Sequence, residues 1–318
     1  LFFFFFLSFG DIFKTLLCDW KFSKRLKSTF YYKKIMDNRL KDFKKVFLIA
    51  GSEPLGSAGL QADIKAVSAC GGFAAGAVTC IVDEDTQRVK DIYTIPVQMI
   101  VNQALSFLED VGADCIKTGM LYSVELVTGI AGLLKQFKDI PKVIDPVMVS
   151  SAGDRLLKEE AVQAYKDLLF PMAAIITPNY REAEVLLGRP VSTEHIKEDL
   201  QELCQWGNAV ILKSVPGEDT LTDYFYDPRT GLMKEFSKQR ILTKNVNGTG
   251  DTFASSIATY VARGYALLDA VRKAEVFIQQ SIESGAMYKF GSGFGPVHPF
   301  FREVSYFREE DLHYAALH

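Results

Sequence analysis

The sequence has 318 residues, of which 48% are hydrophobic, and a formal net charge of −3. A chain of this length and apolar content can bury a sizeable core, as one large α/β domain or two modest ones. The slightly acidic balance gives no electrostatic reason to expect binding to nucleic acid or to an anionic membrane surface. The five cysteines are scattered, without a CxxC pair or clustered histidines, which argues against a disulfide framework or a zinc site and favours a reducing cytoplasm.

The first 35 residues differ in character from the rest of the chain. Their opening apolar run is less than half as long as the ~20 residues that a helix needs to cross a bilayer. No basic segment precedes it and no small-residue cleavage site follows, which argues against a secretory signal peptide. We interpret residues 1–35 as upstream sequence translated in frame, with Met36 as the natural start. The alternative is a short membrane-surface anchor.

Apolar runs and helical segments alternate along the chain from Lys45 onward. The apolar runs are rich in valine and isoleucine, as expected for strands covered on both faces. They lie at residues 46–52, 76–85, 114–120, 142–148, 173–179 and 208–214. The segments between them carry apolar residues three and four apart, which is the period of a helix. These segments lie at residues 57–71, 96–112, 123–137, 159–170 and 192–207. The alternation predicts a mainly parallel sheet with right-handed crossovers.

The pattern changes after the sixth expected strand. Residues 221–241 predict an antiparallel hairpin, with a turn rich in proline and glycine at Asp227–Gly231. Two long helices follow, over roughly residues 250–264 and 267–287.

We expect a single folded domain, because no linker or change in composition divides residues 45–300. The domain is placed at residues 41–305. Residues 1–40 are expected to be a non-native or disordered N-terminal extension, and residues 306–318 a C-terminal tail.

Polar or glycine-rich strings follow five of the expected strands. They are AGSEPLGSAG at 50–59, DEDT at 83–86, KTGM at 117–120, DPVMVSSAGD at 145–154 and TPNYRE at 177–182. In an open parallel sheet, ligands bind beyond the carboxyl ends of the strands, so these strings gather on one rim. Any one of them reads as an ordinary turn, but five on one rim favour a binding site. The first string matches neither the dinucleotide-binding fingerprint nor a Walker A loop.

The string GTGDTF opens the first of the two long helices. Gly248, Thr249 and Gly250 can point successive N–H groups into one concavity, where the helix N-terminus adds positive potential. Asp251 stands in the first turn, where a carboxylate also serves as a plain helix cap. The glycines before it favour a functional role. An anion hole beside a carboxylate suits phosphoryl transfer, in which the carboxylate takes the proton from an attacking hydroxyl.

Three further polar residues lie where they can meet phosphates. Asn179 and Glu182 stand three apart at a helix start, so both can face one side of the helix. Their oxygens suit a hard cation on ATP phosphates, directly or through water, and a simple helix cap is the alternative. Lys213 ends the sixth expected strand, where it can meet a phosphate or extend into solvent.

Together these strings resemble the ribokinase-like superfamily of small-molecule kinases, and more closely the hydroxymethylpyrimidine/phosphomethylpyrimidine kinases of thiamine biosynthesis. The likeness covers roughly residues 45–300. The strings that carry it are AGSEPLGSAGLQADIKA, IKTGML, VIDPVMVSSAGDRLL, IITPNYREAEVLLG, NGTGDTFASSIA and GSGFGPVHPF. The resemblance implies an α/β fold, the ribokinase-like three-layer sandwich with a mainly parallel central sheet and helices on both faces.

The resemblance also implies phosphorylation of 4-amino-5-hydroxymethyl-2-methylpyrimidine, and then of its monophosphate, with ATP and Mg²⁺ as cofactors. By position, the resemblance implies that Asp251 is the catalytic base and that the anion hole is formed by Gly248, Thr249 and Gly250. It implies a pyrimidine pocket lined by Ala58, Glu84, Met120 and Val147. It also implies that ATP and its phosphates contact Asn179, Glu182 and Lys213, and that a metal ion is bound by Glu182 and Asp145. Ser150–Asp154 matches a mobile loop near the phosphates. The implied partners are an aminopyrimidine alcohol and ATP, without nucleic acid or membrane, and kinases of this superfamily are often homodimers.

The chain departs from the pyrimidine kinases at three places. The pyrimidine kinases usually carry a cysteine after their Gly-Thr-Gly, whereas this chain carries Asp251. Ribokinases and many pyridoxal kinases also carry an aspartate at this position. Glu84 replaces a glutamine that reads the pyrimidine edge, and KSVPGE replaces a Lys-Gly-Gly-His string. The Glu84 carboxylate can accept from an exocyclic amine of a pyrimidine or serve a protonated pyridine. We favour a pyrimidine kinase; the alternatives are a pyridoxal/pyridoxine kinase on the same fold and a non-catalytic regulator that binds a vitamin precursor.

Overall fold

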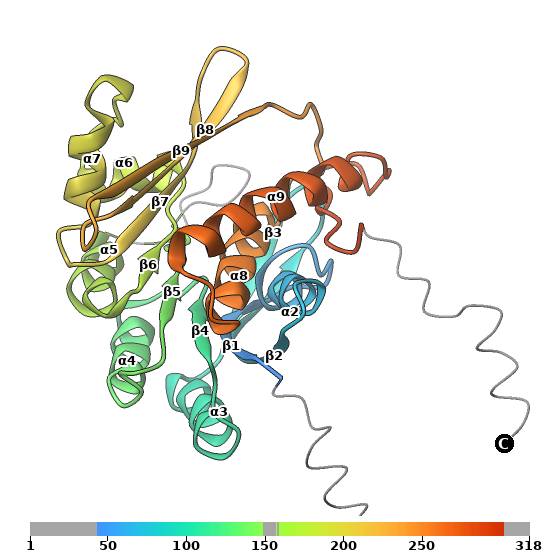
Figure 1. The fold of residues 1–318 in the computed structure, drawn as a ribbon. Helices are drawn as coiled ribbons and strands as arrows, with labels where there is room; N and C mark the ends of the chain where they lie inside the picture. The colour runs from blue at the N-terminus through green and yellow to red at the C-terminus, as the bar shows by residue number, and fades with distance from the viewer. Residues whose placement is uncertain (1–42, 149–156, 158, 302–318) are drawn as a thin grey trace, which may run out of the picture. The chain divides into compact units, whose positions relative to one another are not determined.

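The computed structural model describes residues 43–148, 157 and 159–301. The expectations for the N-terminal extension, the loop Ser150–Asp154 and the C-terminal tail lie outside these residues. A compact unit begins at Lys44 and contains a nine-stranded sheet in the order β3-β2-β1-β4-β5-β6-β7-β8-β9 (Figure 1). The strands are β1 Lys45–Ser52, β2 Phe73–Glu84, β3 Val89–Thr94, β4 Cys115–Thr118, β5 Lys142–Ile144, β6 Ile175–Ile176, β7 Ala209–Pro216, β8 Thr220–Asp227 and β9 Leu232–Gln239.

Helices cover both faces of this sheet. The strands β2, β1, β4, β5, β6 and β7 are parallel, whereas β3 at one edge and the hairpin β8–β9 at the other are antiparallel. The helices are α2 Gly59–Ala69, α3 Val97–Asp110, α4 Val124–Leu134, α5 Glu159–Ala164, α6 Tyr180–Leu187, α7 Ile196–Leu203, α8 Thr249–Ala262 and α9 Leu267–Gly285. Helices α3 to α7 pack on one face, and α2, α8 and α9 on the other. The predicted three-layer α/β sandwich with a mainly parallel sheet is confirmed.

Strand β1 shows why the parallel strands are apolar along their whole length. Phe47 and Ile49 contribute to the core under α3 to α7. Val46, Leu48 and Ala50 contribute to the core under α2, α8 and α9. All five side chains are buried. Because both faces of the strand are covered, polar and apolar residues have no reason to alternate.

A π-helical turn at Tyr165–Leu169 interrupts the expected helix 159–170. Tyr165 in this turn is fully buried. Its hydroxyl accepts a hydrogen bond from the N–H of Leu121 at 3.1 Å and donates one to the carbonyl of Gly119 at 3.3 Å. Such turns are frequent at functional sites, and here the turn fixes the loop that follows β4.

The edge strand β3 is not predicted by the sequence. Its side chains are mostly exposed, and Tyr93 reaches 69%. A strand without a buried face carries no apolar period, so only its pairing with β2 reveals it. The turn between β2 and β3 is nevertheless important, because its residues line the cavity described below.

The two sides of helix α4 offer a matched test of the core. Leu126 is fully buried, whereas Val124 is 42% exposed. We predict that Leu126→Ala lowers the free energy of unfolding by about 2–5 kcal/mol, because it deletes buried methyl groups and leaves a cavity. Val124→Ala is expected to change it by less than about 0.5 kcal/mol. Urea unfolding followed by circular dichroism measures both values, and equal losses would contradict this assignment of the two sides.

Candidate active site

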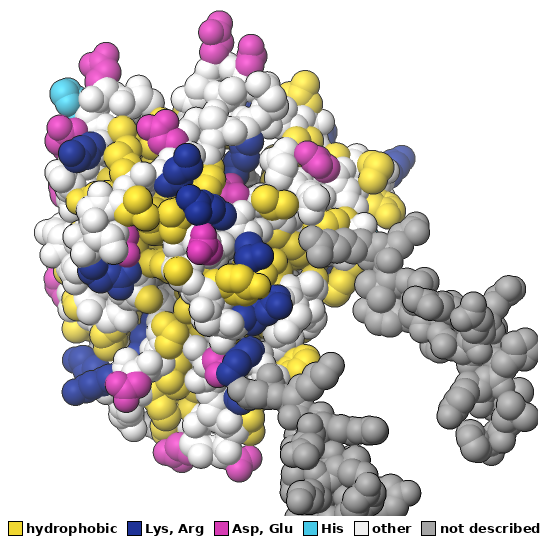
Figure 2. Space-filling model, viewed as in Figure 1, with side chains coloured by type: hydrophobic (Ala, Val, Ile, Leu, Met, Phe, Trp, Pro, Cys, Tyr) yellow, Lys and Arg dark blue, Asp and Glu magenta, His cyan; other side chains and the backbone are white. Residues whose placement is uncertain are grey.

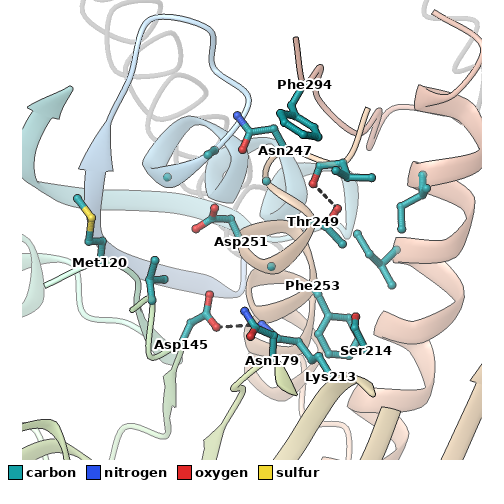
Figure 3. A pocket seen from close by; sticks show the side chains of 18 of the residues that line it. Met120, Asp145, Asn179, Lys213, Ser214, Asn247, Thr249, Asp251, Phe253 and Phe294 are labelled. Atoms are coloured by element: carbon teal, nitrogen blue, oxygen red, sulfur yellow. Dashed lines mark hydrogen bonds and ion pairs between the residues drawn. The ribbon is translucent and has the colours of Figure 1, made fainter. Parts of the chain in front are cut away.

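A cavity of about 470 Å³ lies at the carboxyl ends of the parallel strands (Figure 3). The residues predicted from the sequence all line it. They are Ala58, Glu84, Met120, Asp145, Val147, Asn179, Glu182, Lys213, Gly248, Thr249, Gly250 and Asp251. The fold therefore brings together motifs that are far apart in the chain, while the role of each residue stays a prediction.

The loop between β1 and α2 is folded around a buried carboxylate, that of Glu53. Its oxygens accept hydrogen bonds at 2.5 to 3.1 Å from the successive N–H groups of Leu55, Gly56, Ser57 and Ala58. The hydroxyl of Ser57 donates a further bond at 3.0 Å. Because the loop supplies its own anion, its shape is fixed and Ala58 is held in the wall of the cavity.

Helix α8 begins in direct contact with this loop. Gly248, at the N-cap, has a φ of 73°, which favours glycine. A Cβ at this position would also overlap the carbonyl oxygen of Ser57. The side-chain amide of Asn247 donates to the hydroxyl of Ser57 at 2.8 Å. The glycine is therefore required both by its backbone conformation and by the close approach of the two segments.

The first turn of α8 keeps N–H groups available for a ligand. Thr249 uses its own donors within the turn, because its N–H and its hydroxyl both donate to the carbonyl of Val246, at 3.2 and 2.6 Å. Within the described part of the chain, no acceptor is found for the N–H of Gly250 or of Asp251. A helix N-terminus with free N–H groups binds anions, so these two groups are the candidate anion hole.

Asp251 lies in the first turn of α8 and lines the cavity (Figure 3). Its side chain is 16% exposed, and its Oδ1 accepts from the Nζ of Lys117 at 3.1 Å. Lys117 is fully buried and also pairs with the fully buried Asp63 at 2.8 Å. Burial raises the pKa of Asp63, whereas the ammonium of Lys117, which donates to both of its oxygens, lowers it and favours the ionised carboxylate. The sequence pattern gave no role to either Lys117 or Asp63.

A second buried ion pair lies at the end of β5. Lys213 of β7 donates to Oδ1 of Asp145 at 3.1 Å, and the hydroxyl of Thr177 donates to the same oxygen at 2.6 Å. Burial alone would raise the pKa of Asp145, but the ammonium of Lys213 and then that of Lys117 hold it below its ordinary value. Asp145 is therefore a carboxylate, and Lys213 is anchored beside Gly250 in the first turn of α8.

Asn179 and Glu182 form a capping box at the start of α6. The N–H of Glu182 donates to Oδ1 of Asn179 at 3.0 Å, and the N–H of Asn179 donates to Oε2 of Glu182 at 2.9 Å. Oε1 of Glu182 accepts from the N–H of Met148 at 3.2 Å. Burial, with the nearby charge of Asp145, raises the pKa of Glu182 to about 8. The pair thus serves as the helix cap and also lines the cavity, while its role toward a cation stays a prediction.

The end of the cavity nearest β1 and β2 is lined by Ala58, Met120, Val147 and Glu84. Glu84 is half-buried at the end of β2, and burial raises its pKa, with smaller contributions from Glu53 and other carboxylates. This end therefore combines apolar walls with the carboxyl group of Glu84.

The C-terminal string GSGFG, residues 291–295, closes over this end. The N–H of Phe294 donates to the carbonyl of Thr86 at 2.6 Å, and the N–H of Gly293 donates to the hydroxyl of Thr86 at 3.1 Å. A Cβ at Gly293 would overlap that carbonyl. Phe294 lines the cavity. The string therefore docks on the turn between β2 and β3 and completes the wall.

The opposite end of the cavity has an apolar wall that is built from β8, α8 and α9. Its wall includes Leu221, Phe253, Ile278 and Ile282. Figure 3 shows Phe253 and Met120 on opposite sides of Asp251. The cavity thus has two ends, with the first turn of α8 between them.

A strained residue stands beside Lys213 at this apolar end. Ser214 has a φ of 58°, and it is the one non-glycine residue with positive φ in the described ranges. Its N–H donates to Oδ1 of Asp223 at 2.6 Å, and Lys238 pairs with both Asp223 and Glu275, at 2.8 and 2.9 Å. Such a backbone costs about 1–3 kcal/mol and persists only where its surroundings impose it. The sequence pattern does not predict this network.

The described residues contain no cluster of three or more His, Cys, Asp or Glu side chains placed to hold a metal ion. No helix among them has the length and apolar character that crossing a membrane requires. On the face shown in Figure 2, basic and acidic side chains are intermingled.

The contact between Gly248 and Ser57 can be tested with a matched glycine. We predict that Gly248→Ala lowers kcat/KM about 100-fold or more, because the overlap with Ser57 displaces the first turn of α8 from the reacting groups. Gly264 also has a positive φ, of 85°, but no atom lies within 4 Å of an added Cβ, so Gly264→Ala is expected to cost only about 1–2 kcal/mol of stability. Steady-state kinetics and thermal unfolding measure the two effects. Equal activity in the two variants would contradict the proposed role of the contact.

Known proteins of one family match this chain over most of its length. The family model described as phosphomethylpyrimidine kinase matches residues 53–298. The hydroxymethylpyrimidine/phosphomethylpyrimidine kinase of Staphylococcus aureus (strain MSSA476) is 34% identical over 280 residues, which cover 85% of this chain and 96% of that protein. The thiamine biosynthesis bifunctional protein ThiED of Geobacter sulfurreducens is 36% identical over 83% of this chain. This chain spans about half of that bifunctional protein, 54% of its length.

Solved structures agree with this match. The phosphomethylpyrimidine kinase of Clostridium difficile 630 has a TM-score of 0.67 and 31% identity, over 75% of this chain and 99% of that one. The pyridoxal kinase of Staphylococcus aureus in complex with ADP has a TM-score of 0.75 and 30% identity, over 83% of this chain and 96% of that one. The predicted resemblance is confirmed, and the chain belongs to the phosphomethylpyrimidine kinase family.

Proposed function

We propose that this chain catalyses the ATP-dependent phosphorylation of 4-amino-5-hydroxymethyl-2-methylpyrimidine and then of its monophosphate. The observation that carries the proposal is the position of Asp251, which stands between the two ends of one cavity, in the first turn of α8. A carboxylate beside free helix N–H groups is suited to activate a hydroxyl and to stabilise a phosphoryl group at the same point.

The two ends of the cavity suit the two substrates. The end lined by Ala58, Glu84, Met120 and Val147 offers an aromatic heterocycle apolar walls and one polar group that reads its edge. The apolar end at α9 suits the adenine of ATP, which places the phosphates near Lys213 and the start of α8. The complex of the Staphylococcus aureus pyridoxal kinase with ADP supports a nucleotide site on this fold.

In the first phosphorylation, the substrate hydroxyl oxygen bonds to the γ-phosphorus as the bond to the β,γ-bridging oxygen breaks and ADP leaves. Asp251 takes the proton of that hydroxyl. The N–H groups of Gly250 and Asp251 stabilise the charge on the transferred phosphoryl oxygens, and Lys213 adds a fixed positive charge. In the second phosphorylation the attacking atom is a phosphate oxygen, which at neutral pH is largely ionised and has no proton to give up.

Asp145 and Glu182 are the residues proposed to hold Mg²⁺. Both are buried carboxyl groups that line the cavity, and the charge of Asp145 contributes to the raised pKa of Glu182. Oxygen donors suit Mg²⁺, which proteins commonly bind through one or two carboxylates together with substrate phosphates and water. The two residues therefore fit the ion. When bound, Mg²⁺ would neutralise part of the charge of the ATP phosphates.

Pyridoxal kinase activity is the second candidate function, and Glu84 is the observation that favours it. The family's usual glutamine has both a donor and an acceptor for an aminopyrimidine edge. A carboxyl group matches that edge only when it is protonated, whereas its ionised form suits a protonated pyridine.

The proposal places the protein in the cytoplasm as a homodimer. The cysteines of the described residues are buried free thiols, which suits a reducing compartment. Apolar side chains of the β2–β3 edge are exposed, with Ile81 at 53% and Tyr93 at 69%, and they offer a surface to a second copy.

The substrate can be decided by direct comparison of the two heterocycles. With MgATP, we expect a higher kcat/KM for the hydroxymethylpyrimidine than for pyridoxal. We expect Glu84→Gln to widen the difference, because an amide offers the pyrimidine edge a donor at every pH. The reverse preference in the wild-type protein would favour the pyridoxal kinase. Binding of either heterocycle without transfer of phosphate would favour the non-catalytic regulator.

The base assignment predicts unequal effects on the two phosphorylations. Asp251→Asn keeps the size of the side chain and is expected to lower kcat of the first step by about 10²–10⁴-fold, because the proton acceptor is lost. The second step is expected to fall much less, since its nucleophile is already ionised. Single-turnover assays with the alcohol and with its monophosphate measure each step separately. An Asp251→Asn variant that retains full activity on the alcohol would refute the assignment.

A further inference from the structure

A cluster of three charges lies beneath the cavity, formed by Asp63 of α2, Lys117 of β4 and Asp251 of α8. The ammonium of Lys117 donates to both oxygens of Asp63, at 2.8 and 3.0 Å, and to Oδ1 of Asp251 at 3.1 Å. The hydroxyl of Ser255, one turn further along α8, donates to Oδ1 of Asp63 at 2.7 Å. An ammonium has three N–H bonds, so each of them has an acceptor here.

Only one member of the cluster can meet a ligand. The side chains of Asp63 and Lys117 are fully buried, whereas that of Asp251 is 16% exposed and lines the cavity. In Figure 3 the carboxylate of Asp251 extends from the start of α8 into the cavity. The two buried charges therefore act on a substrate only through Asp251.

Fold stability alone explains this cluster poorly. Moving charges from water into the interior is unfavourable, and an apolar set of similar volume is often at least as stable as a buried ion pair. Asp63 and Lys117 already form a neutral pair without a third member. The bond from Lys117 to Asp251 connects this pair to a carboxylate that lines the cavity, which points to a role in the reaction.

We propose that Lys117 and Asp63 are positioning residues that hold the carboxylate of Asp251 for proton transfer from the substrate hydroxyl. The proposal rests on the kinase function proposed above. Lys117 binds Oδ1, so that Oδ2 is the oxygen left for the hydroxyl. Its ammonium also balances the negative charge of Asp251 in a cavity that contains further carboxyl groups.

Asp63 allows the cluster to accommodate both states of the reaction. When Asp251 takes the proton of the hydroxyl, its negative charge is lost and Lys117 keeps a weaker partner on that side. A buried ammonium without a counter-ion would be strongly disfavoured. Lys117 retains both oxygens of Asp63, so it stays paired throughout. The cluster passes from one net negative charge to none, and no buried charge is left alone.

Other charged groups also surround Asp251. Within the described residues these include Glu84 of β2, Asp145 after β5 and Lys213 of β7, and Glu53 and Glu182 line the same cavity. Asp145 and Lys213 are paired with each other at 3.1 Å, so their charges largely cancel. Glu84 is a further carboxyl group. Lys117 is therefore the cation whose removal acts most directly on Asp251.

The pH dependence of kcat in three variants of the full chain tests the proposal, with saturating MgATP and hydroxymethylpyrimidine. Lys117→Met removes the ammonium but keeps an unbranched side chain. Asp63→Asn removes one negative charge at constant size. Ser255→Ala is the matched control, because it removes a hydrogen bond to Asp63 and leaves all three charges in place. Ionisation of the two substrates is common to all variants.

The two charge-changing variants are expected to shift the acidic limb of the profile in opposite directions. Lys117→Met is expected to move the acidic limb to higher pH by about one unit or more, because a carboxylate without its ammonium binds a proton more tightly. It is also expected to lower the maximal kcat about tenfold or more. Asp63→Asn moves the limb to lower pH, because Lys117 then pairs with Asp251 alone. Ser255→Ala leaves the limb within about 0.3 units, since it changes no charge.

The proposal would be overturned if the acidic limb shifted in the same direction in both charge-changing variants, or in neither. A purely structural role of these residues would lower stability without shifting the limb in opposite directions. Circular dichroism and ATP binding establish that each variant is folded. If Lys117→Met does not fold, the direction of the shift in the nearly isosteric Asp63→Asn decides. A wild-type chain that transfers no phosphate contradicts the kinase function itself, and that result is obtained before any variant is made.

Discussion

The close approach of α8 to the loop after β1 is the contact on which the site depends. Gly248 stands so near the carbonyl of Ser57 that no side chain fits between them. The loop is held in shape by the carboxylate of Glu53, so the start of α8 is set against a rigid surface. A wider separation would draw the helix N–H groups and Asp251 away from a ligand bound along the loop. The Gly-Thr-Gly string is therefore as much a packing requirement as a means of binding phosphate.

Electrostatics poses the main difficulty for a site that must accept ATP, because most of its ionisable groups are acidic. Two buried lysines offset this, each bonded to a carboxylate, Lys117 to Asp251 and Lys213 to Asp145. Further compensation comes from backbone N–H groups at the start of α8, which carry no net charge and need no counter-ion. The site thus presents fixed dipoles and paired ions to the phosphates.

The sequence predicts the central fold well, because fully buried strands and amphipathic helices leave clear patterns. It also predicts which strings meet at the cavity, since the carboxyl ends of parallel strands share one edge. It does not predict β3, whose exposed side chains carry no period, nor the pairing of Lys117 with Asp63. A lysine within a short apolar run and an aspartate within a helix each read as solvent-facing residues. Only the packing of α2 and α8 against β4 shows that they are partners.

The docking of GSGFG on Thr86 joins segments that are 207 residues apart in the chain. Synthesis proceeds from the N-terminus, and domains fold as their residues become available. The parallel sheet and most of its helices are complete before residues 291–295 emerge, but one wall of the heterocycle end is still missing. Enclosure of the substrate is therefore among the last properties that the nascent chain acquires. A partly synthesised chain has much of the scaffold of the site but lacks the closed pocket in which ATP would be used.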